Sequence, residues 1–186
     1  MKLIYDAAHA FGVKHQGQSL LNFGDMSIIS FHATKVFNTI EGGAVCFHDE
    51  EYGDKLRKLK DFGIKSAEVV DGIGANAKMN EFQAAMGLCN LRHVDDEISK
   101  RKSLVEAYRH LLNSIDGLYI CPEQQNLKSN YAYFPIVIDE SKYGFSRNEL
   151  HRVLQENKVY ARKYFYPLTN SFDCYFGRFN DCFEKY

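Results

Sequence analysis

The chain begins with short apolar runs that each end in polar residues. Their composition predicts strands near Leu3–Asp6, Met26–Phe31 and Ala44–Phe47. The first two runs have the pattern of buried strands with polar side chains at their carboxyl ends. In open α/β sheets, ligands bind at that edge. The pattern therefore predicts an α/β fold with a ligand site near residues 6–9 and 30–35.

A charged run and a glycine-rich segment follow. The run Glu50–Asp61 predicts a solvent-exposed helix that is closed by Gly63. The segment Val69–Lys78 lacks periodicity and predicts a loop. Asn80 and Gln83 have the three-residue spacing of a reciprocal helix cap. A second helix is therefore expected to begin directly after Asn80.

From Phe82 onward, apolar residues recur at spacings of three and four. This period predicts a long amphipathic helix that runs towards Ser114, with a break near Asp95–Asp96. We place the domain boundary within this helix. Residues 1–98 then form the first domain, and residues 99–186 form a small C-terminal α+β domain.

The C-terminal domain is expected to contain two strands and one helix. Tyr131–Ile138 predicts a strand, and Pro135 suggests an edge position or a bulge. Ser146–Glu149 has the pattern of a capping box, which predicts a helix that ends near Glu156. Val159–Tyr164 predicts the second strand.

The polar residues at the two strand ends have the chemistry of a cofactor site. Pyridoxal phosphate needs an amine to hold its aldehyde and a carboxylate beside its ring nitrogen. Lys35 and Asp6 suit these two tasks, and a desolvated strand end suits a nucleophilic amine. His9 lies three residues after Asp6, within reach of the ring hydroxyl if the chain turns into a helix there, and Ser30 suits the phosphate.

Each of these residues also has an ordinary interpretation. An aspartate after a strand usually caps a helix or a turn. A single lysine is usually solvated, and His9 and His32 taken singly are usually hydrogen-bonded structural residues. Ser30 can satisfy a backbone group. Only the combination favours a cofactor site.

Several motifs occur in the order found in a known family. They are Asp6–Gly12, Gly24–Asp25, Ser30–Lys35, Glu41–Ala44, Gly74–Ala85 and Ala161–Leu168. With these motifs the chain resembles the DegT/DnrJ/EryC1/StrS family of sugar aminotransferases from about Leu3 to Leu168. The resemblance implies an α/β fold that is part of a fold-type-I transferase dependent on pyridoxal phosphate. Residues 1–98 would be the remaining part of the cofactor-binding large domain.

The resemblance also implies a role for each site residue. Lys35 would hold the cofactor's aldehyde, Asp6 would contact the pyridine nitrogen, and His9 would sit at the ring hydroxyl. Ser30 would bind the phosphate. Asn76 is similar to a residue that reaches the phosphate from the partner subunit. A homodimer with a site shared between subunits is therefore implied.

The substrate implied by the resemblance is a nucleotide-linked keto sugar. Arg162, Tyr164 and Tyr166 would bind it, since cations neutralise phosphate and aromatic rings stack on bases or sugars. The same residues also suit an ordinary edge strand. Lysine at position 35 favours transamination, because the similar dehydratase branch has histidine there. Glutamate is the expected amino donor.

Composition and charge limit the kinds of partner and cellular compartment that the sequence supports. The chain has 186 residues, 45% of them hydrophobic, which is enough for a sizeable core. Its net charge of -1, from 23 basic and 24 acidic side chains, disfavours a nucleic-acid partner. Five cysteines without a CxxC pair or a secretory leader predict reduced thiols in a cytoplasm. The chain lacks the apolar run of about 20 residues that a membrane span requires.

Length raises an alternative hypothesis. Members of the family carry a much longer stretch before the aspartate motif, and it holds a phosphate cup and most strands of the large domain. A chain without that stretch is expected to expose apolar sheet and helix surface, and therefore to associate. The alternative is a non-catalytic remnant, or a dimerising or binding domain, of such an enzyme.

Overall fold

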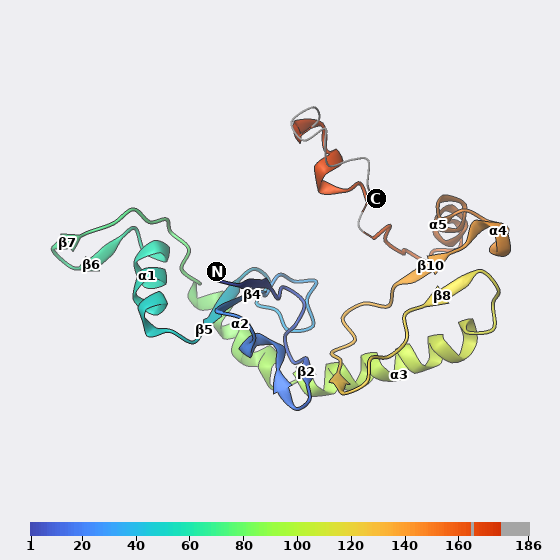
Figure 1. The fold of residues 1–186 in the computed structure, drawn as a ribbon, viewed down its shortest axis with the longest axis horizontal. Coiled ribbons are helices and arrows are strands. Elements are labelled where there is room, and N and C mark those ends of the chain that lie inside the picture. Colours follow the sequence, from blue (N-terminus) through green and yellow to red (C-terminus); the bar gives the residue numbers. More distant parts are fainter. Residues whose placement is uncertain (165, 176–186) are drawn as a thin grey trace. The chain divides into compact units, whose positions relative to one another are not determined.

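The computed structural model describes residues 1–164 and 166–175, which form a mixed α/β structure (Figure 1). Phe165 and residues 176–186, which belong to the predicted C-terminal domain, lie outside the described residues. The strands are β1 (Ile4–Asp6), β2 (Lys14–His15), β3 (Gln18–Ser19), β4 (Met26–Ser30), β5 (Gly43–Phe47), β6 (Ile64–Ser66), β7 (Val69–Val70), β8 (Leu118–Ile120), β9 (Leu127–Lys128) and β10 (Ile136–Ile138). The helices are α1 (Glu50–Lys60), α2 (Glu81–Leu91), α3 (Val94–Leu112), α4 (Glu140–Tyr143) and α5 (Arg147–Glu156), with short 3-10 turns η1 (Leu20–Asn22), η2 (Thr169–Ser171) and η3 (Asp173–Tyr175).

Contacts divide the described chain into two compact units. The first contains residues 1–110 and 122–134, and the second contains residues 111–121 and 135 onward. Residues 99–110 and 122–134, which the sequence analysis assigned to the C-terminal domain, therefore group with the first unit. The domain boundary of the family fold stays a prediction.

The sheet of the first unit has the strand order β1-β4-β5. β1 runs parallel to β4, with Asp6 opposite Ile28, and β5 runs antiparallel to β4. The three predicted strands are confirmed. The expectation that β1 is buried is wrong: all three of its residues are exposed, because among the described strands β1 pairs only with β4. β4 is buried on one face only, through Ser27 and Ile29.

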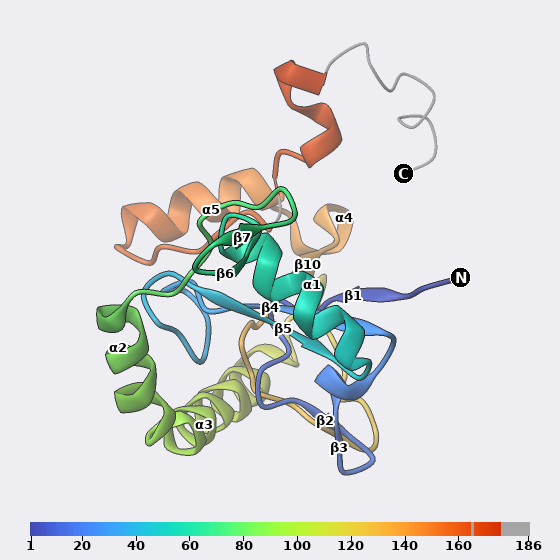
Figure 2. The same ribbon diagram turned by 90° about the vertical axis from the view of Figure 1, so that its left-hand side faces the viewer.

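Helix α1 begins and ends as the charged run predicts. Asp49 is the N-cap, and its carboxylate accepts a hydrogen bond from the backbone N–H of Glu51 at 3.0 Å. Arg57 is among the basic residues of the last turn, where positive charge favours the helix dipole. Gly53 faces the Phe47 ring of β5 so closely that a Cβ would lie 3.0 Å from it. The helix therefore lies close to the sheet (Figure 2).

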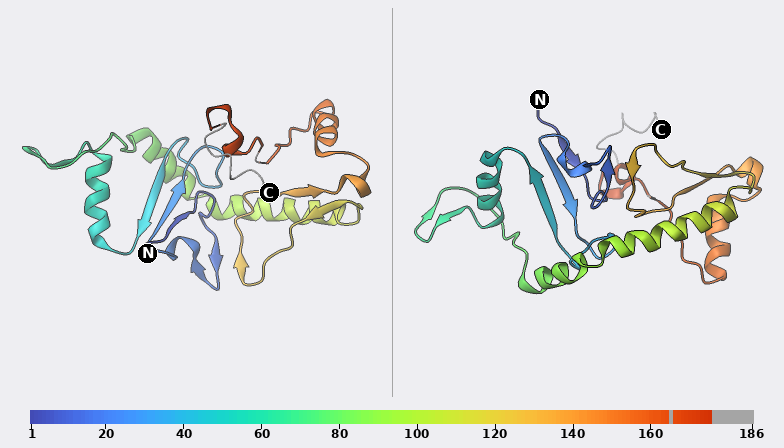
Figure 3. Two further views of the ribbon diagram at one scale, coloured as in Figure 1. Left: turned by 45° about the horizontal axis from the view of Figure 1, so that its top comes forward. Right: turned by 90° about the horizontal axis from the view of Figure 1, so that it is seen from below.

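Helices α2 and α3 replace the single long helix, and they follow one another after a short break (Figure 3). The break falls at Arg92–His93, slightly before the expected position. The Asn80–Gln83 capping box is confirmed, since each side chain accepts a hydrogen bond from the other residue's backbone N–H. Gly87 of α2 is buried, and a Cβ there would lie 2.9 Å from the Thr39 methyl group. The small residue lets α2 approach the loop that precedes β5.

The core of the first unit forms where α3 meets the loop between β4 and β5. Phe37, Val94 and Ile98 are buried together, and Phe11, Phe31, Val36 and Tyr131 pack around them. The rings of Phe11 and Phe37 stack with centroids 4.4 Å apart. Burial of these aromatic and aliphatic groups fixes the loop against the helix.

Segment 69–78 is not wholly a loop. Val69–Val70 forms β7, which pairs antiparallel with β6 across a register irregularity. The two β-branched residues favour this hairpin, and periodicity could not reveal so short a strand. Asn76 follows the hairpin and forms an isolated bridge with Asp61.

The second unit contains β8 and β10 as an antiparallel pair, followed by α4 and α5. The Ser146–Glu149 capping box and the helix to Glu156 are confirmed. The strand predicted over 131–138 is shorter than expected and covers only the residues of β10, because the segment before Pro135 turns into the first unit. Among the described residues, no strand forms over 159–164: the N–H of Val159 instead donates to Leu154 at the end of α5.

Gly63 provides a test of the turn after α1. Its φ of +76° and its closeness to the Gly72 carbonyl leave no room for a Cβ. We expect Gly63→Ala to lower the free energy of unfolding by more than about 1 kcal/mol. Gly72→Ala is the control, since a Cβ there meets no atom within 4 Å. Urea unfolding followed by circular dichroism measures both, and equal stabilities would contradict this packing.

Candidate active site

The parallel pairing of β1 and β4 brings two polar strand ends together. Asp6 ends β1 and Ser30 ends β4, and the N–H of Ala7 continues the pairing by donating to Ile28 at 2.9 Å. Both chains therefore leave the sheet at the same edge. The expectation that these two strand ends lie side by side is confirmed.

The chain turns sharply after β1. The Asp6 carboxylate accepts a hydrogen bond from the N–H of Ala8 at 3.1 Å, and Ala10 donates to the Ala7 carbonyl at 2.9 Å. The first bond is the local side-chain turn that aspartate favours. Asp6 therefore stabilises a turn, as an aspartate after a strand usually does. The turn presents His9 next to the β4 side of the edge.

Lys35 meets His9 at this edge. Lys35 Nζ lies 2.9 Å from His9 Nε2, and both side chains are half-buried. They line a pocket together with Ala8, Phe11, Thr34, Val36, Asn130, Ala132 and Tyr133. Two of the predicted site residues are thus in direct contact within a pocket, although 26 positions separate them in the sequence.

The environment of His9 favours the neutral ring. Burial is the main cause that lowers the pKa of His9, the positive charge of Lys35 lowers it further, and Asp6 opposes both. A neutral Nε2 can accept a hydrogen bond from the Lys35 ammonium group. The pair therefore joins a basic amine to an acceptor that orients it.

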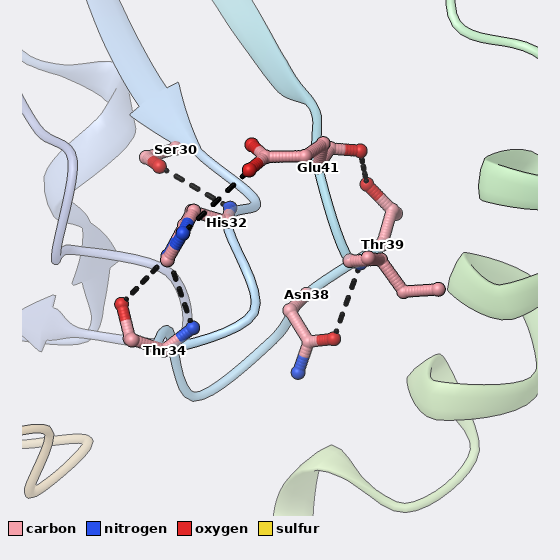
Figure 4. Close-up of polar contacts among 7 residues, drawn as sticks. Ser30, His32, Thr34, Asn38, Thr39 and Glu41 are labelled. Atoms are coloured by element: carbon pink, nitrogen blue, oxygen red, sulfur yellow. Dashed lines mark hydrogen bonds and ion pairs between the residues drawn. The ribbon is translucent and has the colours of Figure 1, made fainter.

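The loop between β4 and β5 carries Lys35 and has its own polar network (Figure 4). His32 Nδ1 accepts a hydrogen bond from the N–H of Thr34 at 3.2 Å, and the Thr34 hydroxyl lies 2.9 Å from the same nitrogen. His32 Nε2 faces the Glu41 carboxylate at 3.6 Å. The Ser30 hydroxyl accepts from the N–H of His32 at 3.3 Å. Ser30 thus satisfies a backbone N–H group, and His32 is a hydrogen-bonded structural residue of the loop.

Thr39 closes the base of this loop. It is almost fully buried, its N–H donates to Phe31 at 2.9 Å, and its hydroxyl donates to the Glu41 carbonyl at 2.6 Å (Figure 4). The N–H of Phe31 in turn donates to Gly42 at 2.8 Å. These bonds hold both ends of the loop, and with them the position of Lys35.

A third segment completes the pocket, and the sequence analysis did not assign it to the site. The Tyr133 hydroxyl lies 2.9 Å from His9 Nε2, and the two rings meet edge to face. Asn130 is buried and donates to the carbonyls of His9 and Phe11. No local pattern marks these residues as partners of His9, since 124 positions separate Tyr133 from it.

The four remaining predicted residues are exposed. Asn76 is exposed, follows the β6–β7 hairpin and does not line the Lys35 pocket. Arg162, Tyr164 and Tyr166 belong to the second unit and are exposed. The Tyr166 ring stacks under the Arg147 guanidinium at 4.7 Å. The structure therefore joins Lys35 to His9, places Asp6 and Ser30 at the same edge, and leaves Asn76 of the first unit outside the pocket.

Other kinds of site find no support in residues 1–164 and 166–175. Within these residues, histidine, cysteine and carboxylate side chains form no cluster of three or more suited to a metal ion. None of the helices described there has the length and apolar character to span a membrane.

A lysine amine held against an imidazole, with an aspartate at the same edge of parallel strands, has the chemistry needed to bind an aldehyde. Comparison with known proteins gives the family. The sequence profile of the DegT/DnrJ/EryC1/StrS aminotransferase family matches residues 1–182, so the chain belongs to that family. The cofactor of the family is pyridoxal phosphate.

Two relatives and two solved structures illustrate the likeness. The chain is 43% identical over 175 residues to a dTDP-4-amino-4,6-dideoxy-D-glucose transaminase of Shigella dysenteriae and 31% identical over 168 residues to a GDP-perosamine synthase of Escherichia coli O157:H7. These matches cover 94% and 89% of this chain, but 47% and 45% of the relatives. The structure of DesI with its TDP-sugar product matches with a TM-score of 0.88 at 34% identity, covering 95% of this chain and 45% of DesI. Helicobacter pylori PseC matches with a TM-score of 0.88 at 26% identity, covering 97% of this chain and 49% of PseC.

The chain thus spans about half the length of the curated relatives that it matches. The fold class expected from the sequence, part of a fold-type-I transferase, agrees with these structures.

Thr39 tests how the Lys35 loop is held. Thr39→Val keeps the shape of the side chain but removes the hydrogen bond that the buried Thr39 hydroxyl donates to the Glu41 carbonyl. We expect a loss of about 1 kcal/mol in the free energy of unfolding. Thr34→Val, which removes an exposed hydroxyl, is expected to cost less than about 0.5 kcal/mol. Chemical denaturation measures both, and similar losses for the two variants would count against a closed loop base.

Proposed function

We propose that this chain is the lysine-bearing part of an aminotransferase dependent on pyridoxal phosphate, which transfers an amino group from glutamate to a keto group of a nucleotide-linked deoxysugar. The contact between Lys35 Nζ and His9 Nε2 carries the proposal, because it places an oriented amine in a pocket. The names of the relatives support the substrate class, since one is a transaminase named for a dTDP-linked amino sugar and the other is a GDP-perosamine synthase.

The residues of the edge suit the cofactor in their chemistry. Bound pyridoxal phosphate supplies an aldehyde that condenses with amines and a ring that accepts the electrons of a cleaved C–H bond. Lys35 would hold the aldehyde carbon and would later carry the proton from the donor's α-carbon. Asp6 would keep a proton on the ring nitrogen, and His9 would bind the ring hydroxyl. Ser30 would donate its hydroxyl hydrogen to the phosphate.

The remaining roles concern the whole protein. Asn76 lies outside the Lys35 pocket, which suits a residue that reaches the phosphate of a partner subunit in a homodimer. Arg162, Tyr164 and Tyr166 would contact the nucleotide-linked sugar. A cytoplasmic location is part of the same proposal, because nucleotide-linked sugars and glutamate are cytoplasmic metabolites.

One observation favours a second candidate, a chain that binds further polypeptide without turnover. Ile4 and Ile28, on neighbouring strands, are 54% and 48% exposed, and Phe82 of α2 is 86% exposed. Apolar side chains exposed on a sheet and a helix are typical of surfaces that another polypeptide covers.

Reductive labelling separates the two candidates. The 186-residue chain is titrated with pyridoxal phosphate, reduced with borohydride and digested, and the pyridoxyl-lysine is located by peptide mass. We expect one dominant label on Lys35, because His9 orients that amine in a pocket. Lys35→Arg should abolish this label.

Lys58→Arg is the matched control. Lys58 is also half-buried, but it is paired with Asp71 at 2.8 Å and lies outside the pocket. This variant should keep the label on Lys35. Labels scattered over many lysines, or one dominant label on another lysine, would contradict the assignment of Lys35 and favour the non-catalytic candidate.

A further inference from the structure

Segment 126–134 reaches the Lys35 pocket from far along the chain, and two sets of backbone bonds anchor its start. β9 pairs antiparallel with β2, with Lys128 opposite Lys14. The N–H of Gln16 donates to the Asn126 carbonyl at 2.8 Å. The segment is therefore tied to the chain that follows His9 before it reaches the pocket.

Asn130 ties the same segment to His9 itself. Its side chain is 4% exposed, and its Nδ2 donates to the carbonyls of His9 at 2.7 Å and Phe11 at 2.9 Å. Its Oδ1 accepts a hydrogen bond from the N–H of Ala132 at 3.1 Å. Both amide hydrogens and the oxygen are thus used, and a buried amide with all its bonds made has one orientation.

The backbone between Asn130 and Tyr133 contains a strained residue. Tyr131 has a φ of +51°, a left-handed conformation that residues other than glycine rarely adopt. Such a conformation costs of order 1 kcal/mol and persists only where the surroundings hold it. Here the Ser129 hydroxyl accepts from the N–H of Tyr131 at 3.0 Å, and Asn130 holds Ala132.

Two groups, the Lys35 amine and the Tyr133 hydroxyl, contact the same nitrogen of His9. His9 Nε2 lies 2.9 Å from Lys35 Nζ and 2.9 Å from the Tyr133 hydroxyl. One ring nitrogen has one lone pair or one proton, so it cannot form a full hydrogen bond with both groups at once. Tyr133 therefore influences how His9 engages the Lys35 amine.

We propose that Asn130 and Tyr133 are positioning residues for the Lys35 amine: Asn130 fixes the backbone of His9, and Tyr133 orients the imidazole ring that contacts Lys35. The proposal rests on the proposed function for its purpose, but its geometry is independent of any cofactor. Neither residue is required to touch the reacting atoms. Each acts through His9.

Tyr133→Phe is the primary variant, since it keeps the edge-to-face ring contact and removes only the hydroxyl. Two readouts are measured: the ¹⁵N chemical shift of His9 Nε2 without cofactor, and the rate of pyridoxyl labelling of Lys35 with pyridoxal phosphate and borohydride. We expect an altered His9 shift and a labelling rate changed roughly three- to tenfold. The thermal unfolding midpoint should stay near that of the original chain.

Tyr131→Phe is the matched control. Tyr131 is also half-buried, but it packs on the hydrophobic cluster and should leave both readouts unchanged. Asn130→Asp is the second variant: it keeps the shape but turns two donors into an oxygen that faces two carbonyls. It should change both readouts more than Tyr133→Phe does.

The outcomes separate the two proposals. An unchanged His9 shift together with an unchanged labelling rate in Tyr133→Phe would overturn the positioning role. Equal changes in Tyr131→Phe would also overturn it, because they would reflect loss of packing. If Lys35 is not labelled in the original chain, the proposed function fails, and the His9 shift alone still decides the positioning role.

Discussion

Strands β1 and β4 run parallel, with Asp6 opposite Ile28, and the site depends on this pairing. Parallel neighbours end at the same edge, so the polar residues that follow each strand are delivered to one place. The turn at Asp6 then presents His9, and the β4–β5 loop presents Lys35. An antiparallel pairing of the same strands would put these residues at opposite edges. The 2.9 Å contact between the two side chains is therefore a consequence of strand direction.

Two kinds of force hold the parts of the site in place. Packing fixes the β4–β5 loop, because Phe37 is buried against Val94 and Ile98 of α3. Hydrogen bonds from buried groups fix the chain direction, through Thr39 at the loop base and Asn130 at the third segment. Buried polar groups of this kind specify one arrangement because every alternative leaves a donor or an acceptor unpaired. The sheet and α2 expose apolar side chains, whereas the buried polar groups near the site are hydrogen-bonded.

Local signals in the sequence predicted much of this structure. The capping box at Asn80 follows from residues three positions apart, and the strand ends at Asp6 and Ser30 follow from apolar runs. The extent of β10 could not be predicted, because residues before Pro135 turn into the pocket through bonds of Asn130 to a distant segment. Tyr133 was missed for the same reason. Its role depends on a contact between segments, whereas periodicity reports only on neighbours along the chain.

In the proposed function, His9 orients the Lys35 amine for attack on an aldehyde. The direct measurement compares borohydride-trapped pyridoxyl labelling of Lys35 in the original chain, in His9→Gln and in His9→Leu. Glutamine retains an acceptor for the amine, whereas leucine fills a similar volume without one. We expect selective labelling of Lys35 in the first two chains and loss of that selectivity in His9→Leu. Equal selectivity in all three would contradict it.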